Sequence, residues 1–201
     1  MLTKLKKKVQ DALSIEAKVA HKIGLTPNVV SIMGFVLAFL SAAAYAVYEN
    51  QPLRLVVGLI LLIASGFCDT LDGVMARTFN QISVFGGFLD SVLDRYADAA
   101  VYMGIIIGGL CDPVVGLIAL AGSLMVSYSR ARAEATGIKM ETIGIAERPE
   151  RIIILAASTL GAIFWVSAMN IGIIVLAVLA NFTVLQRGLY FYKKCKKSKI
   201  S

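Results

Sequence analysis

Acidic side chains recur at helical spacing in the middle of this chain, between two strongly apolar stretches. Asp69 and Asp72 are three residues apart, and Asp90 and Asp94 are four residues apart. Because residues three or four apart lie on the same face of a helix, each pair projects from one side of its own helix. Carboxylates that converge in this way repel one another unless a cation lies between them. Hard oxygen ligands suit Mg²⁺, Ca²⁺ or Mn²⁺, so the spacing predicts a divalent metal site.

The flanking sequence places these carboxylates at membrane depth. The stretch LVVGLILLIASGF precedes the first pair, and AAVYMGIIIGG follows the second. Ionisable residues inside a membrane-spanning segment are costly to bury and usually functional. The composition agrees, because 58% of the 201 residues are hydrophobic and the mean hydropathy is +0.77. A soluble domain of this size is excluded by such a composition.

The hydropathy pattern predicts an all-α integral membrane fold with six transmembrane helices. A crossing needs ~20 apolar residues, and segments near that length lie at roughly 28–48, 53–76, 84–108, 113–135, 152–168 and 170–192. Lysine and arginine gather at both chain ends, around Arg77 and between Arg130 and Arg151, whereas the alternate loops hold only Arg54. By the positive-inside rule, both termini and the acidic site are expected on the cytoplasmic side of the cell membrane.

The chain ends are expected to contact the membrane surface. Apolar residues recur within 1–24 at steps of three and four with lysines between them, which is typical of an interfacial amphipathic helix, a solvated basic tail being the alternative. This helix would precede a membrane domain over 25–192 and a basic cytoplasmic tail over 193–201. The net charge of +7 favours anionic lipid or phosphate over nucleic acid as partner. The cysteines form no CxxC or Cys/His grouping, so neither a zinc site nor a disulfide framework is predicted.

The complete acidic motif resembles a known enzyme signature. The chain contains Asp69-x2-Asp72-Gly73-x2-Ala76-Arg77-x8-Gly86-x3-Asp90-x3-Asp94. This motif is similar to the signature of the CDP-alcohol phosphotransferase family, with every defining position filled. The resemblance implies an integral-membrane enzyme, usually a homodimer, that moves a substituted phosphate from a CDP-linked alcohol onto a second alcohol and releases CMP.

The resemblance assigns the aspartates to metal binding and catalysis. It implies Asp69, Asp72, Asp90 and Asp94 as ligands of Mg²⁺ or Mn²⁺, with two ions per site. Such ions would clamp a pyrophosphate and neutralise the charge that builds on the leaving phosphate. The resemblance also implies Asp94 as the base that takes the proton from the incoming hydroxyl, which requires hydrogen-bonding distance to that oxygen. Asp98 lies outside the family pattern, so an interhelical polar contact is its expected role and catalysis the alternative.

Other residues near the motif suit a nucleotide. Gly73 has no side chain, so a nucleotide can approach its backbone, and Arg77 is placed for a bidentate grip on phosphate. In the family, the pocket for the CDP group is also lined by the segment that matches Asn28, Val29, Val30 and Ser31 and by the position of Ser83. Without the resemblance, Asn28 would mark only a helix start and Ser83 only a loop.

The second substrate is predicted from the basic residues. The segments RARAEATG and ERPER resemble the corresponding part of phosphatidylinositol-phosphate synthases and their archaeal relatives, which use inositol phosphate as acceptor. In those enzymes three basic residues surround the acceptor's phosphate, and the matching positions are Arg130, Arg151 and Arg187. A dianionic phosphomonoester suits three converging arginines. The alternatives are an ordinary positive-inside loop and, for Arg187, a side chain that snorkels to the headgroups.

The sequence therefore predicts an enzyme that transfers a phosphatidyl-type group from a CDP-activated lipid to inositol 1-phosphate and releases CMP. Within the family, phosphatidylglycerophosphate synthase and a di-inositol-phosphate synthase that uses CDP-inositol are the alternatives. An intramembrane prenyltransferase would release pyrophosphate instead of CMP. A cation channel or transporter would line its path with aspartates, but Gly73, Ala76 and Arg77 at fixed offsets have no place in such a path.

Overall fold

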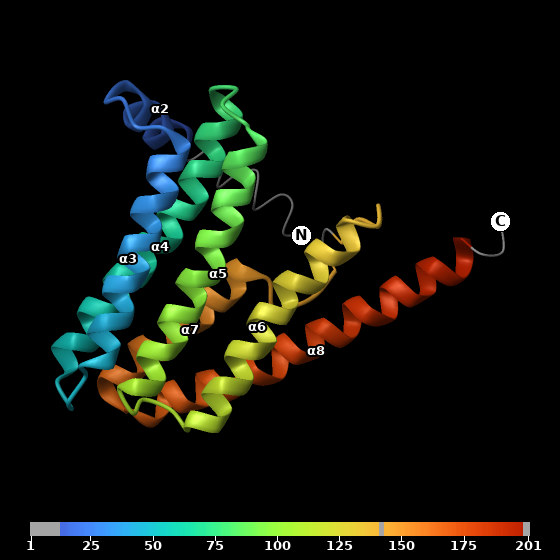
Figure 1. Ribbon diagram of the computed structural model, residues 1–201. Coiled ribbons are helices and arrows are strands. Elements are labelled where there is room, and N and C mark those ends of the chain that lie inside the picture. Colours follow the sequence, from blue (N-terminus) through green and yellow to red (C-terminus); the bar gives the residue numbers. More distant parts are fainter. Residues whose placement is uncertain (1–12, 141–142, 199–201) are drawn as a thin grey trace.

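The computed structural model of this protein describes residues 13–140 and 143–198, and the described ranges contain helices and loops but no strand. Figure 1 shows the helices as a bundle from which α8 extends. Their bounds are Ser14–Lys22 (α2), Pro27–Ala46 (α3), Pro52–Thr78 (α4), Val84–Ile107 (α5), Pro113–Glu134 (α6), Arg148–Phe164 (α7) and Ser167–Ser198 (α8). Proline stands in the first turn of α3, α4, α6 and α7, where its missing N–H has no intrahelical partner to lose.

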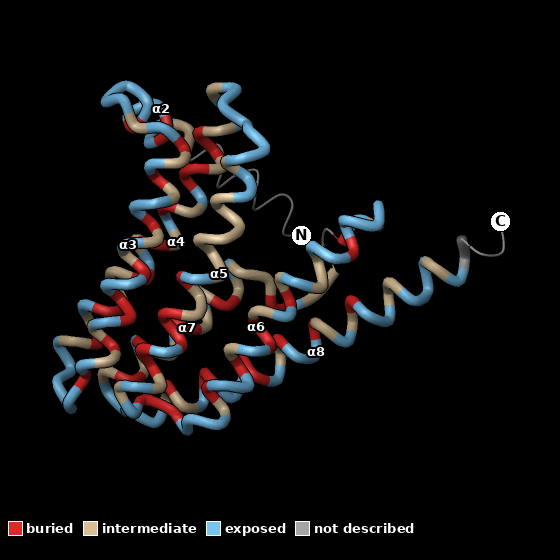
Figure 2. The backbone as a smooth tube through the Cα atoms, in the orientation of Figure 1, coloured by how far each residue is buried: buried red, intermediate tan, exposed pale blue. Residues whose placement is uncertain are grey.

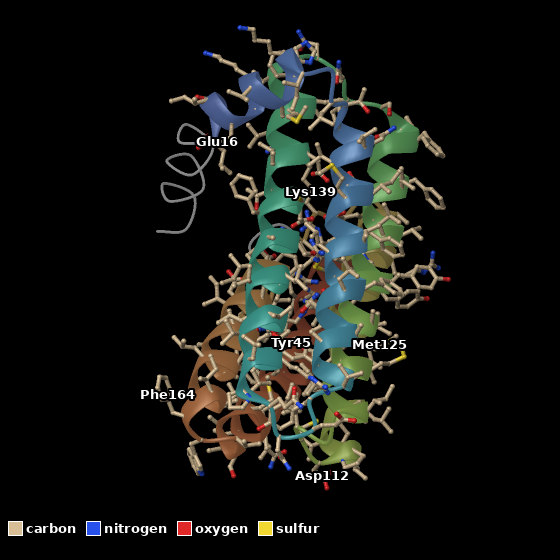
Figure 3. All side chains as sticks on the ribbon, turned by 90° about the vertical axis from the view of Figure 1, so that its left-hand side faces the viewer. Glu16, Tyr45, Asp112, Met125, Lys139 and Phe164 are labelled. Atoms are coloured by element: carbon tan, nitrogen blue, oxygen red, sulfur yellow. The ribbon has the colours of Figure 1, made fainter. Side chains whose placement is uncertain are left out.

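The bundle consists of two packed groups of helices. Helix α3 packs along α4 and α5, α6 packs along α8, and α7 joins the groups through contacts with α4 and α8. Figure 3 shows Glu16 at one end of the bundle and Asp112 at the other, with Tyr45 among the helices. The Tyr45 hydroxyl lies 3.0 Å from Thr159 Oγ1, so a hydrogen bond satisfies this buried phenol inside the apolar core.

Two glycines let the helices around the site approach closely. A Cβ on Gly104 of α5 would collide with the carbonyl oxygen of Ala42 in α3, so no larger residue fits there. A Cβ on Gly34 of α3 would lie 3.0 Å from the Cβ of Cys68 in α4, and Ser65 Oγ donates to the Gly34 carbonyl oxygen at 2.8 Å. The Gly34 contact fixes α3 against α4 beside Asp69, and the Gly104 contact fixes α3 against α5 nearly three turns beyond Asp94.

Four of the described helices are long and apolar enough to cross a membrane, namely α3, α4, α6 and the Ser167–Lys196 part of α8. Helix α5 carries too many charged residues, and α7 has only 17 residues. The predicted count of six transmembrane helices is therefore not established by length and composition. Large apolar side chains such as Ile60 and Val178 point outward with more than half of their surface exposed, and Figure 2 shows exposed residues along the outer faces. Such outward apolar faces suit lipid.

The amphipathic helix predicted over 1–24 is only partly open to comparison, because residues 1–12 lie outside the described residues. Helix α2 packs on α4 with Ala17 and Ala20 buried, and the His21 ring stacks on Phe79 at 3.9 Å between centroids. At the other end, α8 continues to Ser198. The predicted tail therefore begins inside a helix, and its last residues, 199–201, lie outside the described ones.

Candidate active site

Helices α4 and α5 bring the two aspartate pairs together. Asp69, Asp90 and Asp94 each offer a carboxylate oxygen, and these oxygens lie within 4.8 Å of one another. The chain turns back between the two helices through a short connection, in which Asn80 has a φ of +53° that asparagine tolerates. Ser83 then caps α5, because its Oγ accepts a hydrogen bond from Gly86 N at 2.9 Å. The turn and the cap together place Asp90 and Asp94 opposite Asp69.

Carboxylates at this separation fit a divalent cation. Bonds from Mg²⁺ or Ca²⁺ to oxygen measure about 2.0–2.6 Å, so two ligands on opposite sides of one ion lie about 4.0–5.2 Å apart. The three side chains are only partly buried, which leaves room for a substrate oxygen beside them. We define this group, Asp69, Asp90 and Asp94, as the aspartate cage.

Asp72 lies beside the aspartate cage but outside it. Its side chain is 5% exposed, and its Oδ2 accepts a 2.5 Å hydrogen bond from Ser31 Oγ of α3. The same cavity is lined by Asp72, Ser31 and the cage residues. Of the four ligands predicted from the sequence, the structure thus brings three into one group and ties the fourth to the predicted nucleotide segment.

Arg148 has no role in the sequence analysis, yet its guanidinium lies against the aspartate cage. Its Nη1 contacts Asp69 Oδ1 and lies 2.9 Å from Asp94 Oδ1, while its Nε donates to Asp98 Oδ1 at 3.4 Å. The sequence did contain a signal, because Pro149 marks the start of a helix. Arg148 is therefore the first residue of α7, at the same end of the bundle as the aspartates.

Asp98 makes the interhelical contact that the sequence predicts. It accepts a hydrogen bond from Arg151 Nη2 at 2.5 Å as well as the one from Arg148. Arg151 is 2% exposed, and its Nη1 donates to the Ala146 carbonyl oxygen at 3.1 Å. Asp98 thus balances the charge of two arginines of α7 from its position on α5.

The three arginines predicted to bind the acceptor come from α6, α7 and α8. Arg187 donates to the Val126 carbonyl oxygen one turn before Arg130, and Arg151 donates to the carbonyl oxygen of Ala146. Since the Ala146 N–H bonds to Thr183, one turn before Arg187, the three arginines lie in one region of the bundle. Arg130 also pairs with Glu134 at 2.9 Å, with 42% of its side chain exposed. Arg130 by itself would fit the alternative of an ordinary positive-inside residue. Arg151 and Arg187 do not fit it, because both are buried.

Arg187 does not snorkel, since it is 2% exposed. Its Nε donates to the Ile143 carbonyl oxygen at 2.7 Å and its Nη1 to that of Val126 at 2.5 Å, while Nη2 lies 3.3 Å from Glu147 Oε1. These bonds hold the segment that leads into α7. The sequence did not reveal this structural role, because both carbonyl oxygens belong to residues far from Arg187 along the chain.

The residues predicted to line the nucleotide pocket lie at the end of the bundle that carries the aspartate cage. A Cβ on Gly86 would lie 2.9 Å from Ser83 Oγ and 3.0 Å from Asn28 Oδ1, so Asn28 and Ser83 meet at this glycine. Val29 is exposed, whereas Val30 is buried in an apolar cluster with Cys68 and Leu71. The Val30 side chain therefore faces the core.

Gly73 and Arg77 lie together on α4, as their spacing predicts. A Cβ on Gly73 would lie 3.3 Å from Arg77 Nη1, and Arg77 is exposed. A side chain at position 73 would crowd this guanidinium. The absence of a side chain at position 73 thus leaves space for the Arg77 guanidinium along α4.

Comparison with known proteins agrees with this geometry. Residues 24–186 match the family described as CDP-alcohol phosphatidyltransferase. The chain is 44% identical over 188 residues to the archaetidylinositol phosphate synthase of Pyrococcus horikoshii, covering 93% of this chain and 94% of that protein. It is 45% identical over 179 residues to the archaetidylinositol phosphate synthase of Methanothermobacter thermautotrophicus, covering 89% of each.

Solved structures of the Mycobacterium tuberculosis phosphatidylinositol phosphate synthase share the fold at 32% sequence identity. The structure with CDP-DAG bound has a TM-score of 0.76 and covers 90% of this chain and 93% of its own. The structure in complex with manganese and citrate has a TM-score of 0.77 and covers 90% and 88%. The matched region contains the aspartate cage and its arginines, and this multi-pass membrane protein belongs to the CDP-alcohol phosphatidyltransferase family.

Proposed function

We propose that this protein transfers a phosphatidyl-type group, the phosphate of a diacylglycerol or archaeol lipid, from a CDP-activated lipid to inositol 1-phosphate and releases CMP. The observation that carries the proposal is the position of the aspartate cage, whose counter-charge is Arg148 of α7, beside Arg151, which pairs with Asp98. Metal ligands and phosphate-binding donors so close together suit the transfer of a lipid-linked phosphate from a cytidine diphosphate to a hydroxyl of a phosphomonoester, with release of CMP. The names of the relatives support the same reaction.

The donor would bind at the aspartate cage. Asp69, Asp90 and Asp94, together with Asp72 beside them, would hold two Mg²⁺ or Mn²⁺ ions, and a manganese complex of a structural relative supports this metal chemistry. Such ions neutralise charge on the diphosphate and on departing CMP. Arg77 would add a bidentate contact to phosphate.

The cytidine end would lie along the start of α3. Ser31 reaches Asp72, and Asn28 and Ser83 border Gly86, so these polar groups face the same region as the cage. Val29 and Val30 would contribute backbone and apolar surface, and Gly73 would let the nucleotide lie close to α4. The lipid tails would remain in the bilayer, because the outer helix faces are apolar.

Asp94 would act as the general base. It would take the proton from the attacking hydroxyl of the acceptor as that oxygen bonds to the lipid-linked phosphorus. The bond from this phosphorus to the oxygen of CMP breaks, and CMP leaves with the electron pair. The product keeps the lipid phosphate and gains the inositol phosphate ester.

The acceptor's own phosphate would be held by Arg130, Arg151 and Arg187. A dianion benefits from several guanidiniums more than a neutral alcohol does, so serine or glycerol would bind poorly here. Arg151 and Arg187 are prepositioned by hydrogen bonds to backbone carbonyl oxygens, which reduces the entropy lost on binding.

The finer topology belongs to this proposal. Helices α5 and α7 would cross the membrane together with the four apolar helices, so both termini would lie on the same side. By the positive-inside rule, that side, and the site with it, would be cytoplasmic. Residues 1–24 would lie on the surface, 25–192 would form the membrane domain, and 193–201 would form a basic tail. The protein would work as a homodimer. Cysteine labelling from each side of intact membranes tests the orientation of the termini.

Purified protein tests the reaction directly. With Mn²⁺ or Mg²⁺, CDP-lipid and inositol 1-phosphate should release CMP, and a chelator should stop the release. Release with glycerol 3-phosphate but not with inositol 1-phosphate would assign a phosphatidylglycerophosphate synthase instead. Turnover of CDP-inositol but not of CDP-lipid would assign the di-inositol-phosphate reaction, and metal-dependent ion flux in liposomes without CMP release would assign a channel.

A further inference from the structure

Arg148 occupies carboxylate oxygens that a divalent ion would use. Its Nη1 contacts Asp69 Oδ1 and lies 2.9 Å from Asp94 Oδ1, and these residues are two of the three members of the aspartate cage. A guanidinium and a divalent cation on the same two oxygens would repel each other strongly at such short range. A metal ion on Asp69 and Asp94 would therefore compete with the observed position of Arg148.

The contacts that Arg148 makes with the aspartate cage differ in kind from its contact with Asp98. Its Nη1 makes ion contacts with Asp69 and Asp94, although it meets the geometry of a hydrogen bond with neither. Its Nε donates to Asp98 Oδ1 at 3.4 Å. A divalent ion that took over Asp69 and Asp94 would therefore leave Arg148 this hydrogen bond to Asp98.

Arg148 borders open space on two sides. Arg148 lines the cavity of the aspartate cage and also a second cavity that contains Asp98, Tyr102 and Arg151. The guanidinium thus lies between two cavities, with carboxylates on both sides. Asp98 is outside the cage, so its oxygens stay available to an arginine when the cage holds metal.

From these contacts we propose that Arg148 is a built-in cation that competes with the divalent ion for Asp69 and Asp94, and that Asp98 retains it when metal binds. Filling the cage moves one arginine toward Arg151, which the proposed function places at the acceptor's phosphate. Metal binding and acceptor binding are then coupled through a single side chain. The inference rests on the proposed metal site and adds a positioning residue to it.

Mn²⁺ binding measured by calorimetry or by electron paramagnetic resonance tests the competition without turnover. Arg148→Gln should lower the Kd for Mn²⁺ by about fivefold or more, the range of ordinary coupling between sites. The same variant, stripped of metal by a chelator, should melt at a lower temperature than the wild type, because the carboxylates lose their counter-charge. Mn²⁺ should then stabilise the variant more than it stabilises the wild type.

Arg95→Gln is the matched control. Arg95 lies 3.7 Å from Asp94 Oδ2, with its Nη1 donating to the Ser91 carbonyl oxygen, so it places a charge near the cage without occupying Asp69. Its removal should change the Kd for Mn²⁺ by less than half as much, on a logarithmic scale, as removal of Arg148. An equal gain in Mn²⁺ affinity in the two variants would show that only the removal of a nearby positive charge matters, and it would refute the proposed exchange of Arg148 for metal.

Asp98→Asn should change the Kd for Mn²⁺ in the opposite direction. Without the Asp98 carboxylate, Arg148 depends more on the aspartate cage, so the variant should bind Mn²⁺ more weakly than the wild type. Unchanged or weaker Mn²⁺ binding by Arg148→Gln would refute the competition whatever Asp98→Asn does. Failure of the wild type to bind Mn²⁺ would instead refute the proposed metal site, and with it the proposed function.

Discussion

Arg187 is predicted to contribute both to acceptor binding and to the stability of the fold, and comparison with Arg130 separates the two contributions. Its guanidinium is buried and donates to the carbonyl oxygens of Val126 and Ile143. The Val126 carbonyl oxygen keeps a hydrogen bond from Ser129 Oγ at 2.9 Å, so Arg187→Ala would leave only the Ile143 carbonyl oxygen without its donor, at a cost of about 1–3 kcal/mol. The expected loss of stability is therefore about 1–3 kcal/mol, a sizeable part of the ~5–15 kcal/mol by which a folded protein is more stable than its unfolded state.

The loss should extend beyond Arg187 itself. Thr183, one turn earlier on α8, accepts hydrogen bonds from the backbone N–H groups of Ile145 and Ala146 at 3.2 and 3.1 Å. Together with Arg187, it holds the segment that positions Arg148 and Arg151. We expect Arg187→Ala to raise the KM for inositol phosphate and also to lower the Tm of the detergent-solubilised protein by at least about 2 °C, since a chain of this size loses about 2–4 °C per kcal/mol.

Arg130→Ala is the control for this experiment. Arg130 is half-exposed and pairs with Glu134 on its own helix, an interaction worth at most about 1 kcal/mol. Its loss should raise the KM for the acceptor with little change in Tm, and Arg187→Lys should recover part of the stability by restoring one donor. An Arg187→Ala protein that melts like the wild type would refute the structural role of this residue.

Other substitutions test the remaining parts of the site. Asp94→Asn should lower kcat by about 10²-fold or more, the usual contribution of a general base, while a CDP-lipid binding assay should still detect the donor; full turnover by this variant would remove Asp94 from the chemistry. Ser31→Ala deprives the buried Asp72 carboxylate of its 2.5 Å donor and should cost about 1–3 kcal/mol, read as a lower Tm, with Thr26→Ala, whose Oγ1 accepts from Val29 N at 3.4 Å on the exposed surface, as the milder comparison. Gly104→Val should prevent monodisperse purification because its side chain meets the Ala42 backbone, whereas Gly188→Ala, where a Cβ meets nothing within 4 Å, should purify normally.

Local sequence information predicted the helices and the meeting of the carboxylates. The spacing of Asp69, Asp72, Asp90 and Asp94 required two helices with one acidic face each, and the apolar stretches around them required a membrane. The hydropathy pattern was less informative for α5 and α7. Helix α5 carries several charges and α7 is short. A helix that other helices shield at a polar site can have either feature, and hydropathy cannot distinguish it from a helix outside the membrane.

Tertiary structure alone decided how the side chains share their partners. The sequence by itself determined that carboxylates would meet near one end of a helical bundle, since periodicity and hydrophobicity act along the chain. Whether Asp72 joins them or turns to Ser31, and whether Arg148 lies among them, depends on the rotation of α3 and α7 against α4 and α5. That rotation comes from packing between residues far apart in sequence, such as the contact of Gly104 with Ala42.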